Sequence, residues 1–144
     1  MKPIYQTIQA NGVQQGDCFR CCIASLLELR AHNVPHFYED ASEGLLDYGT
    51  VQKMQDWFRS QANPLYYFEI GFPVSLHQVL HGMADVNTNL SYVITGRNRN
   101  KQTHSMLARN ARFIHDPASE TITDPLPFPC ADGAYRVGII AKYL

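Results

Sequence analysis

The sequence predicts an α+β fold in which helices come first and an antiparallel sheet follows. Three apolar patterns with helical spacing lie before residue 87, and most of the β-prone stretches follow residue 89. This segregated order is typical of an α+β domain rather than of alternating βαβ units. Because no repeat, linker or low-complexity tract divides the chain, we expect a single domain over residues 1–144.

The first predicted helix carries the residue on which the functional argument rests. Its apolar positions recur at the i, i+3, i+4 and i+7 spacing of an amphipathic helix: Phe19, Cys22, Ile23, Leu26 and Leu27. Asp17 is expected to be the N-cap, so Cys18 lies in the first turn, at the edge of the core-facing stripe. Val34-Pro35 is expected to end the helix, because the residue before a proline avoids the helical region.

Capping signals and β-prone stretches predict the remaining elements. A second helix is expected to begin with Thr50 as its N-cap and to stop before Pro64. A third begins with the capping box of Ser75 and Gln78. Aromatic and β-branched stretches predict strands at 65–70, 90–95, 104–109, 112–116 and 135–141.

Composition and charge exclude several classes of function. Only 17% of the residues are charged, the net charge is −1 and no basic face stands out, so nucleic acid and anionic membranes are not expected partners. No apolar run approaches the roughly 18 residues of a membrane span, and the first residues lack the apolar stretch of a signal peptide. We therefore expect a soluble protein of the cytoplasm.

The four cysteines, Cys18, Cys21, Cys22 and Cys130, are expected to be reduced thiols. Three of them fall on one predicted helix, where the geometry does not suit them to bridging one another, and Cys21 lies away from the core stripe. The Cys18–Cys21 pair is a C-x-x-C motif, so a zinc or redox module is one alternative. A structural zinc site needs a second pair of ligands, and the sequence has no second C-x-x-C. We therefore expect no metal and no organic cofactor.

The position of Cys18 favours a reactive thiol. A helix N-terminus supplies unpaired N–H groups and about half a positive charge, both of which stabilise a thiolate. Asp17 opposes this effect through its like charge, so a neighbouring base must also contribute. The alternative is that Cys18 is a small buried core residue.

His104 and Asp116 are predicted to form the second half of the site. They flank a hairpin, with His104 at the start of one strand and Asp116 at the end of the next. With a three-residue loop, 109–111, Ala108 pairs with Arg112, and His104 faces Asp116 with Cβ atoms about 5 Å apart. A carboxylate there can orient the imidazole, as a nucleophile–base–acid triad requires. A two-residue turn would instead put the two side chains on opposite faces.

Other histidines are alternative candidates. His115 is a rival base, although the preferred register turns it to the opposite face from His104. His77 and His81 are four residues apart on one predicted helix, like a pair of metal ligands. Both lie away from the predicted core, so we expect them on a solvated face.

Three groups of motifs run through most of the chain. They are Met1-Lys2-Pro3 with Tyr5-Gln6-Thr7; Gly16-Asp17-Cys18-Phe19-Arg20 with Ala24-Ser25-Leu26-Leu27-Glu28 and Val34-Pro35-His36-Phe37; and Tyr92-Val93-Ile94-Thr95-Gly96 with His104-Ser105 and His115-Asp116-Pro117. The combination resembles small papain-like cysteine proteins of bacteria and their phages, which are similar to the peptidases that process bacteriocin leaders. The resemblance implies a papain-like fold with Cys18 as nucleophile, His104 as base and Asp116 as orienting acid. Cys21 and Ala111 depart from it, because the family has Ala and a hairpin Gly at these places.

The resemblance also implies a glutamine upstream of the nucleophile, whose amide helps to bind the oxyanion. Gln6 matches by its Gln-Thr motif, whereas Gln14 and Gln15 are closer to Cys18 in sequence. The expected function is cleavage of peptide or isopeptide bonds in a protein or peptide substrate, in the host cytoplasm if the protein is phage-encoded. Deamidation or acyl transfer by the same triad is an alternative, and so is a non-catalytic papain-fold binding module.

Overall fold

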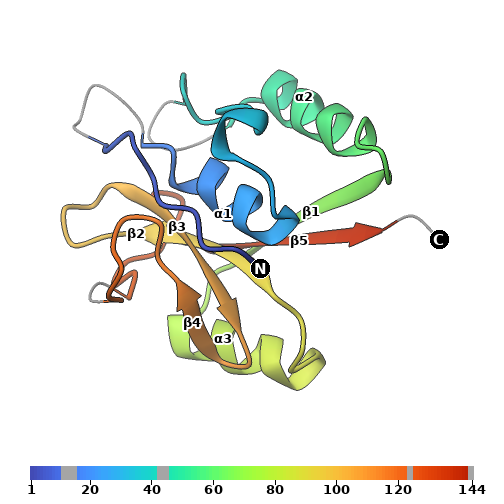
Figure 1. The fold of residues 1–144 in the computed structure, drawn as a ribbon. Coiled ribbons are helices and arrows are strands. Elements are labelled where there is room, and N and C mark those ends of the chain that lie inside the picture. The colour runs from blue at the N-terminus through green and yellow to red at the C-terminus, as the bar shows by residue number, and fades with distance from the viewer. Residues whose placement is uncertain (11–15, 42–45, 123–124, 143–144) are drawn as a thin grey trace.

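The computed structural model describes residues 1–10, 16–41, 46–122 and 125–142, and Figure 1 shows their arrangement. In chain order the elements are α1 (Cys18–Leu27), the 3-10 helix η1 (Ala31–Asn33), α2 (Tyr48–Arg59), β1 (Leu65–Phe72), α3 (Leu76–Val86), β2 (Tyr92–Arg97), β3 (Thr103–Arg109), β4 (Arg112–His115) and β5 (Tyr135–Lys142). The described strands form one antiparallel sheet in the order β1-β5-β2-β3-β4. The predicted α+β class is confirmed.

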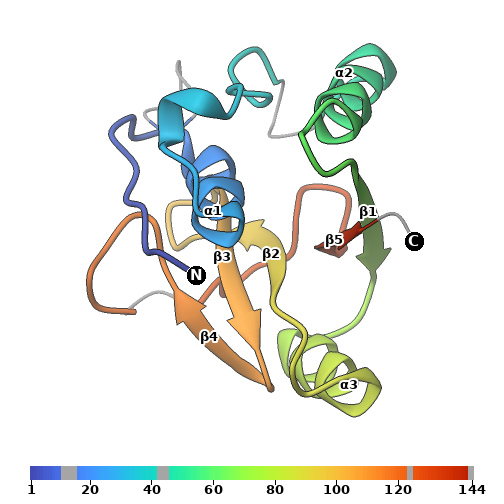
Figure 2. The ribbon, with the colours of Figure 1, turned by 45° about the vertical axis from the view of Figure 1, so that its right-hand side comes forward.

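Helices cover both faces of the sheet. α1 and α2 lie over one face and α3 lies over the other, as two views show (Figures 1 and 2). Strands β2 and β3 divide their side chains between two apolar clusters, because neighbours along a strand point to opposite faces. Val93 and Leu107 pack in the cluster that contains Phe19 of α1, whereas Ile94 and Met106 pack with side chains of α3. The first of these clusters holds α1, which starts at Cys18, against β3.

α1 begins at Cys18, as predicted, but ends at Leu27, well before the predicted stop at Pro35. Glu28 adopts a left-handed conformation with φ of 56°. The amides of Glu28 and Leu29 both donate to the carbonyl of Ala24, which satisfies the last turn. The helix therefore ends through its own main-chain cap, and η1 intervenes before the proline.

Asp17 stands at the N-cap position but makes no capping hydrogen bond, so its predicted capping role is wrong. Its buried carboxylate accepts a hydrogen bond from the amide of Ile8 at 3.1 Å, and its own amide donates to the Ile8 carbonyl at 3.2 Å. Arg20 lies 3.8 Å from the carboxylate. Asp17 is turned away from the first turn because it holds the N-terminal segment beside α1.

The same segment explains the burial of Cys21, which the helical pattern places outside the core stripe. The amide of Ile4 donates to Oγ of Ser25 at 2.9 Å, and that hydroxyl donates to the Cys21 carbonyl at 2.7 Å. Cys21 is fully buried as a result. The pattern of apolar residues in α1 alone could not show that the N-terminal segment lies beside this helix.

The caps of the other two helices differ in how well the sequence predicts them. Asp47, not Thr50, is the N-cap of α2, because its carboxylate accepts from the Thr50 amide at 2.7 Å. α3 has the predicted capping box, in which Ser75 and Gln78 exchange hydrogen bonds between side chain and main chain.

Candidate active site

Cys18 lies where the start of α1 meets β3. The residue is 7% exposed and lines a cavity. The main-chain amide of Ser105 donates to Sγ of Cys18 over 3.4 Å, and the amide of Phe19 also hydrogen-bonds to the sulfur. Donors of this kind stabilise a thiolate, so the position suits a nucleophile.

The β3–β4 hairpin turns more tightly than predicted. Arg109 pairs with Arg112, so the turn has two residues, Asn110 and Ala111, rather than three. Both have positive φ, 52° and 61°, as a type I′ turn requires. The predicted pairing of Ala108 with Arg112 is therefore wrong, because Ala111 adopts the left-handed conformation without being a glycine.

A β-bulge compensates for the shorter turn. Ala108 pairs with Phe113, but Leu107 pairs with His115, so Ile114 is an extra residue in β4. The insertion reverses the alternation of side chains between the two faces. The face to which each side chain points is thereby restored, although the pairing is displaced by two residues from the predicted register.

Beyond the bulge, His104 and Asp116 lie on the same face and contact each other, but they are not the directly opposed pair that was predicted, since Leu107 already pairs with His115. Nε2 of His104 lies 2.8 Å from Oδ1 of Asp116, and both residues are buried. The amide of Ala118 donates to the same carboxylate oxygen at 2.9 Å. Oδ1 of the carboxylate is thus held by two donors.

His104 hydrogen-bonds to Cys18 as well as to Asp116. Burial lowers the pKa of His104, but the hydrogen bonds and negative charges of its two partners raise it to about 10. Burial raises the pKa of the Cys18 thiol, but the hydrogen bond and charge of His104, together with the Ser105 amide, hold it below its usual value. Burial raises the pKa of Asp116, but the hydrogen bond from His104 keeps it below its usual value. These directions favour a thiolate–imidazolium pair beside a carboxylate.

The other candidate histidines lie elsewhere. Nε2 of His115 donates to the carbonyl of Ile4 at 2.8 Å, and its ring meets Tyr5 edge-on at a centroid distance of 5.1 Å. The rival base is therefore held by the N-terminal segment. His77 and His81 lie exposed on α3 with ring centroids 4.1 Å apart, on the solvated face predicted for them.

A cavity of about 160 Å³ lies over the Cys18 side chain. Its polar walls are the carboxamides of Gln6, Gln9, Asn98 and Gln102 and the hydroxyls of Thr103 and Ser119. Among its described lining residues, the ionisable groups are Cys18, His104 and Asp116. This volume is that of about five water molecules, which is enough for one small side chain or a short piece of main chain.

Gln6 shares this cavity with Cys18, as the resemblance implies. Its main-chain amide donates to the carbonyl of Pro117 at 2.8 Å, which ties the N-terminal segment to the chain after Asp116. Its side-chain Nε2 donates to the Ile8 carbonyl and to Oε1 of Gln9, both at 3.0 Å. A side-chain N–H donor therefore lies in the wall of the cavity.

Gly16 leaves the room that Gln6 occupies. A Cβ atom on this glycine would lie 3.0 Å from the Ile8 carbonyl oxygen and 3.3 Å from Nε2 of Gln6. Gln14 and Gln15, the other candidates for the oxyanion role, lie outside the described residues.

Sequence reasoning missed the contact between Ser105 and Cys18. The hydroxyls of Ser105 and Thr95 are hydrogen-bonded at 2.7 Å in the interior, next to the Ser105 amide that donates to Cys18. The pairing of β2 with β3 places Thr95 directly opposite Ser105. That register is the one signal that could have indicated the hydroxyl pair, and it needs the sheet order to be known.

The remaining thiols differ from Cys18. Burial raises the pKa of Cys21 to about 12, and it also raises the pKa values of Cys22 and Cys130. All four cysteines are free thiols. Within the described ranges, no group of three or more His, Cys, Asp and Glu side chains is placed to hold a metal ion.

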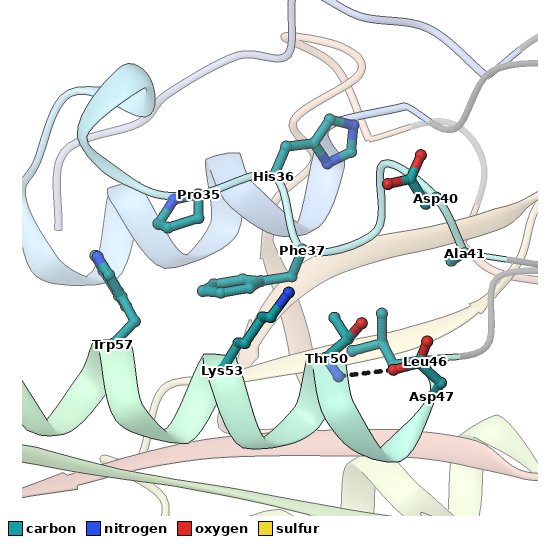
Figure 3. Close-up of a pocket in the computed structure, with 10 residues that line it drawn as sticks. All are labelled: Pro35, His36, Phe37, Asp40, Ala41, Leu46, Asp47, Thr50, Lys53 and Trp57. Atoms are coloured by element: carbon teal, nitrogen blue, oxygen red, sulfur yellow. Dashed lines mark hydrogen bonds between the residues drawn. The ribbon is translucent and has the colours of Figure 1, made fainter.

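A larger cavity, of about 540 Å³, lies between α2 and the chain that follows η1 (Figure 3). Phe37 and Trp57 form an aromatic wall, with ring centroids 6.0 Å apart. Lys53 and Asp47 also line it, and the Asp47 carboxylate is the one that caps α2 through Thr50. Among the described residues, this cavity shares no lining residue with the one over Cys18.

Comparisons with protein-family models, with curated proteins and with solved structures find no match for this chain. In the part of the chain that the structure describes, no helix has the length and apolar character needed to cross a membrane.

Proposed function

We propose that this protein is a papain-like thiol hydrolase that cleaves peptide or isopeptide bonds. Cys18 is the nucleophile, His104 is the general base and acid, and Asp116 orients His104. The observation that carries the proposal is one buried imidazole hydrogen-bonded both to a thiol of lowered pKa and to a buried carboxylate. Such a chain of groups activates a nucleophile and fixes the tautomer of its base.

The arrangement of elements supports a papain-like fold. The proposed nucleophile begins a helix, α1, that packs on an antiparallel sheet, and the proposed base lies on a strand of that sheet, β3. The motifs around Cys18, His104 and Asp116 occur in this order along the chain. Geometry and resemblance therefore point to the same three residues.

In the first half-reaction, the Cys18 thiolate attacks the carbonyl carbon of the scissile amide. The His104 imidazolium gives its proton to the leaving amine, the C–N bond breaks, and the acyl group stays on Cys18 as a thioester. Because Nε2 of His104 is hydrogen-bonded to Asp116, Nδ1 is the nitrogen that serves the sulfur and the leaving group.

In the second half-reaction, neutral His104 takes a proton from water, and the resulting hydroxide attacks the thioester. The C–S bond breaks, the acid product leaves, and the thiolate and imidazolium are restored. Asp116 stays ionised throughout and holds the ring in place.

The main-chain amide of Cys18 and the side chain of Gln6 are the proposed donors to the oxyanion. The first N–H of a helix has no acceptor within the helix, and Nε2 of Gln6 lies in the wall of the same cavity. Removing one such donor typically costs about a hundredfold to a thousandfold in rate.

The proposed substrate is a protein or peptide with a small, uncharged group at the reacting carbonyl, because the cavity is small and its other walls are neutral. Free thiols throughout fit a reducing compartment such as the cytoplasm. The carboxamide walls also favour a second candidate, deamidation or amine transfer at a primary carboxamide, since they match both its donors and its acceptors. Both candidates share the thioester on Cys18.

The test is incubation of the purified protein with a peptide library prepared from a bacterial lysate, followed by mass spectrometry of new N-termini and of glutamine-to-glutamate changes. Cleavage is expected with the wild type and with Cys21→Ala, the matched control on the same helix. Cys18→Ala should show none. Products that are equally abundant with Cys18→Ala would overturn the proposal, and glutamate without new N-termini would select the second candidate.

A further inference from the structure

Both hydrogens on Nε2 of Gln6 are in use in the structure. One is donated to the main-chain carbonyl of Ile8 and the other to the side-chain Oε1 of Gln9, each at 3.0 Å. A carboxamide nitrogen has only these two hydrogens. For Gln6 to bind an oxyanion as described above, one of the two bonds must first open.

The two bonds differ in how firmly their acceptors are held. Ile8 is fixed from both directions by Asp17, which accepts from its amide at 3.1 Å and donates to its carbonyl at 3.2 Å. Gln9, by contrast, is exposed, and its bond with Gln6 lies at the surface. The bond to Ile8 therefore fixes the Gln6 carboxamide, and the bond to Gln9 is the one that can exchange.

The surroundings also fix which end of the Gln6 carboxamide faces Gln9. Turning the carboxamide round would bring its oxygen against the Ile8 carbonyl and against Oε1 of Gln9, and both of these are acceptors. Nε2 therefore stays on this side. Gln9 lines the cavity over Cys18 together with Gln6, so the bond between their side chains lies at the wall of that cavity.

We infer that Gln9 is a positioning residue whose side-chain oxygen occupies the oxyanion donor of Gln6 until a substrate carbonyl displaces it. The inference rests on the proposed function, since it needs Gln6 to be an oxyanion donor. The main chain on either side of Gln9 is anchored, at Ile8 by Asp17 and at Ala10 by Gln102, whose Nε2 donates to the Ala10 carbonyl at 3.1 Å. The displacement therefore needs only a rotation of the Gln9 side chain.

The test is the acylation of Cys18 by p-nitrophenyl acetate, a small neutral ester, followed through the release of nitrophenolate. Gln9→Ala frees Nε2 of Gln6 and should raise the rate of acylation about three- to tenfold, the factor that corresponds to the net free energy of one hydrogen bond. Gln9→Asn should also raise it, because its carboxamide is one methylene shorter. Gln9→Glu should lower it, since a carboxylate accepts more strongly and puts negative charge where the oxyanion forms.

Two sets of variants make the test specific. In the Gln6→Ala background, Gln9→Ala and Gln9→Asn should have no effect, because the donor that they free is absent. Gln52→Ala removes an exposed glutamine of α2 and should leave the rate unchanged. Circular dichroism of each variant establishes that the fold is kept.

The outcomes separate this inference from the proposed function. If wild-type acylation depends on Cys18, but Gln9→Ala and Gln9→Asn are no faster than the wild type, the role of Gln9 is wrong and the hydrolase remains. Faster acylation with Gln9→Glu would also overturn it. If Cys18→Ala releases nitrophenolate as fast as the wild type, the proposed function fails and the inference fails with it.

Discussion

Nε2 of His104 lies 2.8 Å from Oδ1 of Asp116. A two-residue turn, together with one extra residue in β4, Ile114, puts the two side chains on the same face of the β3–β4 hairpin. The short turn alone would put them on opposite faces of the hairpin, and so would the bulge with a three-residue loop. In combination the two irregularities restore the alternation. Because Nε2 of His104 donates its hydrogen bond to the Asp116 carboxylate, Nδ1 is the ring nitrogen left to interact with Cys18.

Cys18 should be the first thiol to be alkylated at about pH 6. Its pKa is lowered by His104 against the effect of burial, whereas burial raises the pKa values of Cys21, Cys22 and Cys130. Since the thiolate is the reactive form, iodoacetamide should modify Cys18 well before the other three. Peptide mapping over time measures the order. Labelling of Cys21 at an equal rate would contradict the assignment of the nucleophile.

His104→Ala should slow this labelling by about a hundredfold or more, because the hydrogen bond and charge of His104 no longer oppose the effect of burial on the Cys18 thiol and little thiolate remains at about pH 6. His115→Ala is the matched control, since His115 donates to the Ile4 carbonyl. It should leave the rate within about twofold of the wild type. If His115→Ala slows the reaction as much as His104→Ala does, the base is assigned to the wrong histidine.

Ala111→Gly should stabilise the protein by about 1 kcal/mol, because a left-handed conformation costs a non-glycine residue about 1–2 kcal/mol and the flexibility of unfolded glycine returns part of the gain. Ala111 has φ of 61° in the β3–β4 turn. Ala131→Gly is the control, because Ala131 is exposed and does not have positive φ. It should be neutral or destabilising. Urea unfolding measures both, and a loss of stability in Ala111→Gly would mean that the turn is not strained.

The sequence predicts well those features that depend on local pattern. The position of Cys18 follows from the spacing of Phe19, Ile23 and Leu26, and the cap of α3 follows from Ser75 and its partner. These features need only the chain within one or two helical turns. They could be read before any tertiary contact was known.

Features that depend on tertiary packing could not be predicted in this way. The bulge at Ile114 changes the register of β4 without a glycine to mark it, so the pairing of His104 with Asp116 was predicted from a loop length that the structure does not have. The burial of Cys21 depends on a distant segment of the chain. The bond between Gln6 and Gln9 depends on how Asp17 holds that segment.

The contribution of Asp116 to stability should disappear in acid. Burial raises its pKa, but the hydrogen bonds from His104 and from the Ala118 amide bring it below the ordinary value of 3.8. A carboxyl group whose pKa is lower in the folded state adds stability above its unfolded pKa and loses it as the pH falls through the folded pKa. The free energy of unfolding of the wild type should therefore exceed that of Asp116→Asn at about pH 6, and the difference should shrink below about pH 3.8.

The contribution of the His104–Asp116 pair to stability should also disappear in alkali, because His104 then loses its proton and its charge. The pKa of His104 is raised from 6.5 to about 10, so the charged imidazole adds its full stability below pH 6.5 and loses it as the pH rises toward about 10. The difference between the wild type and Asp116→Asn should therefore be largest between about pH 4 and pH 6.5 and should fall on both sides. Urea unfolding at a series of pH values measures it. A difference that is the same at about pH 3 and about pH 6 would show that Asp116 acts through packing rather than through its charge, and the electrostatic account of the site would then be wrong.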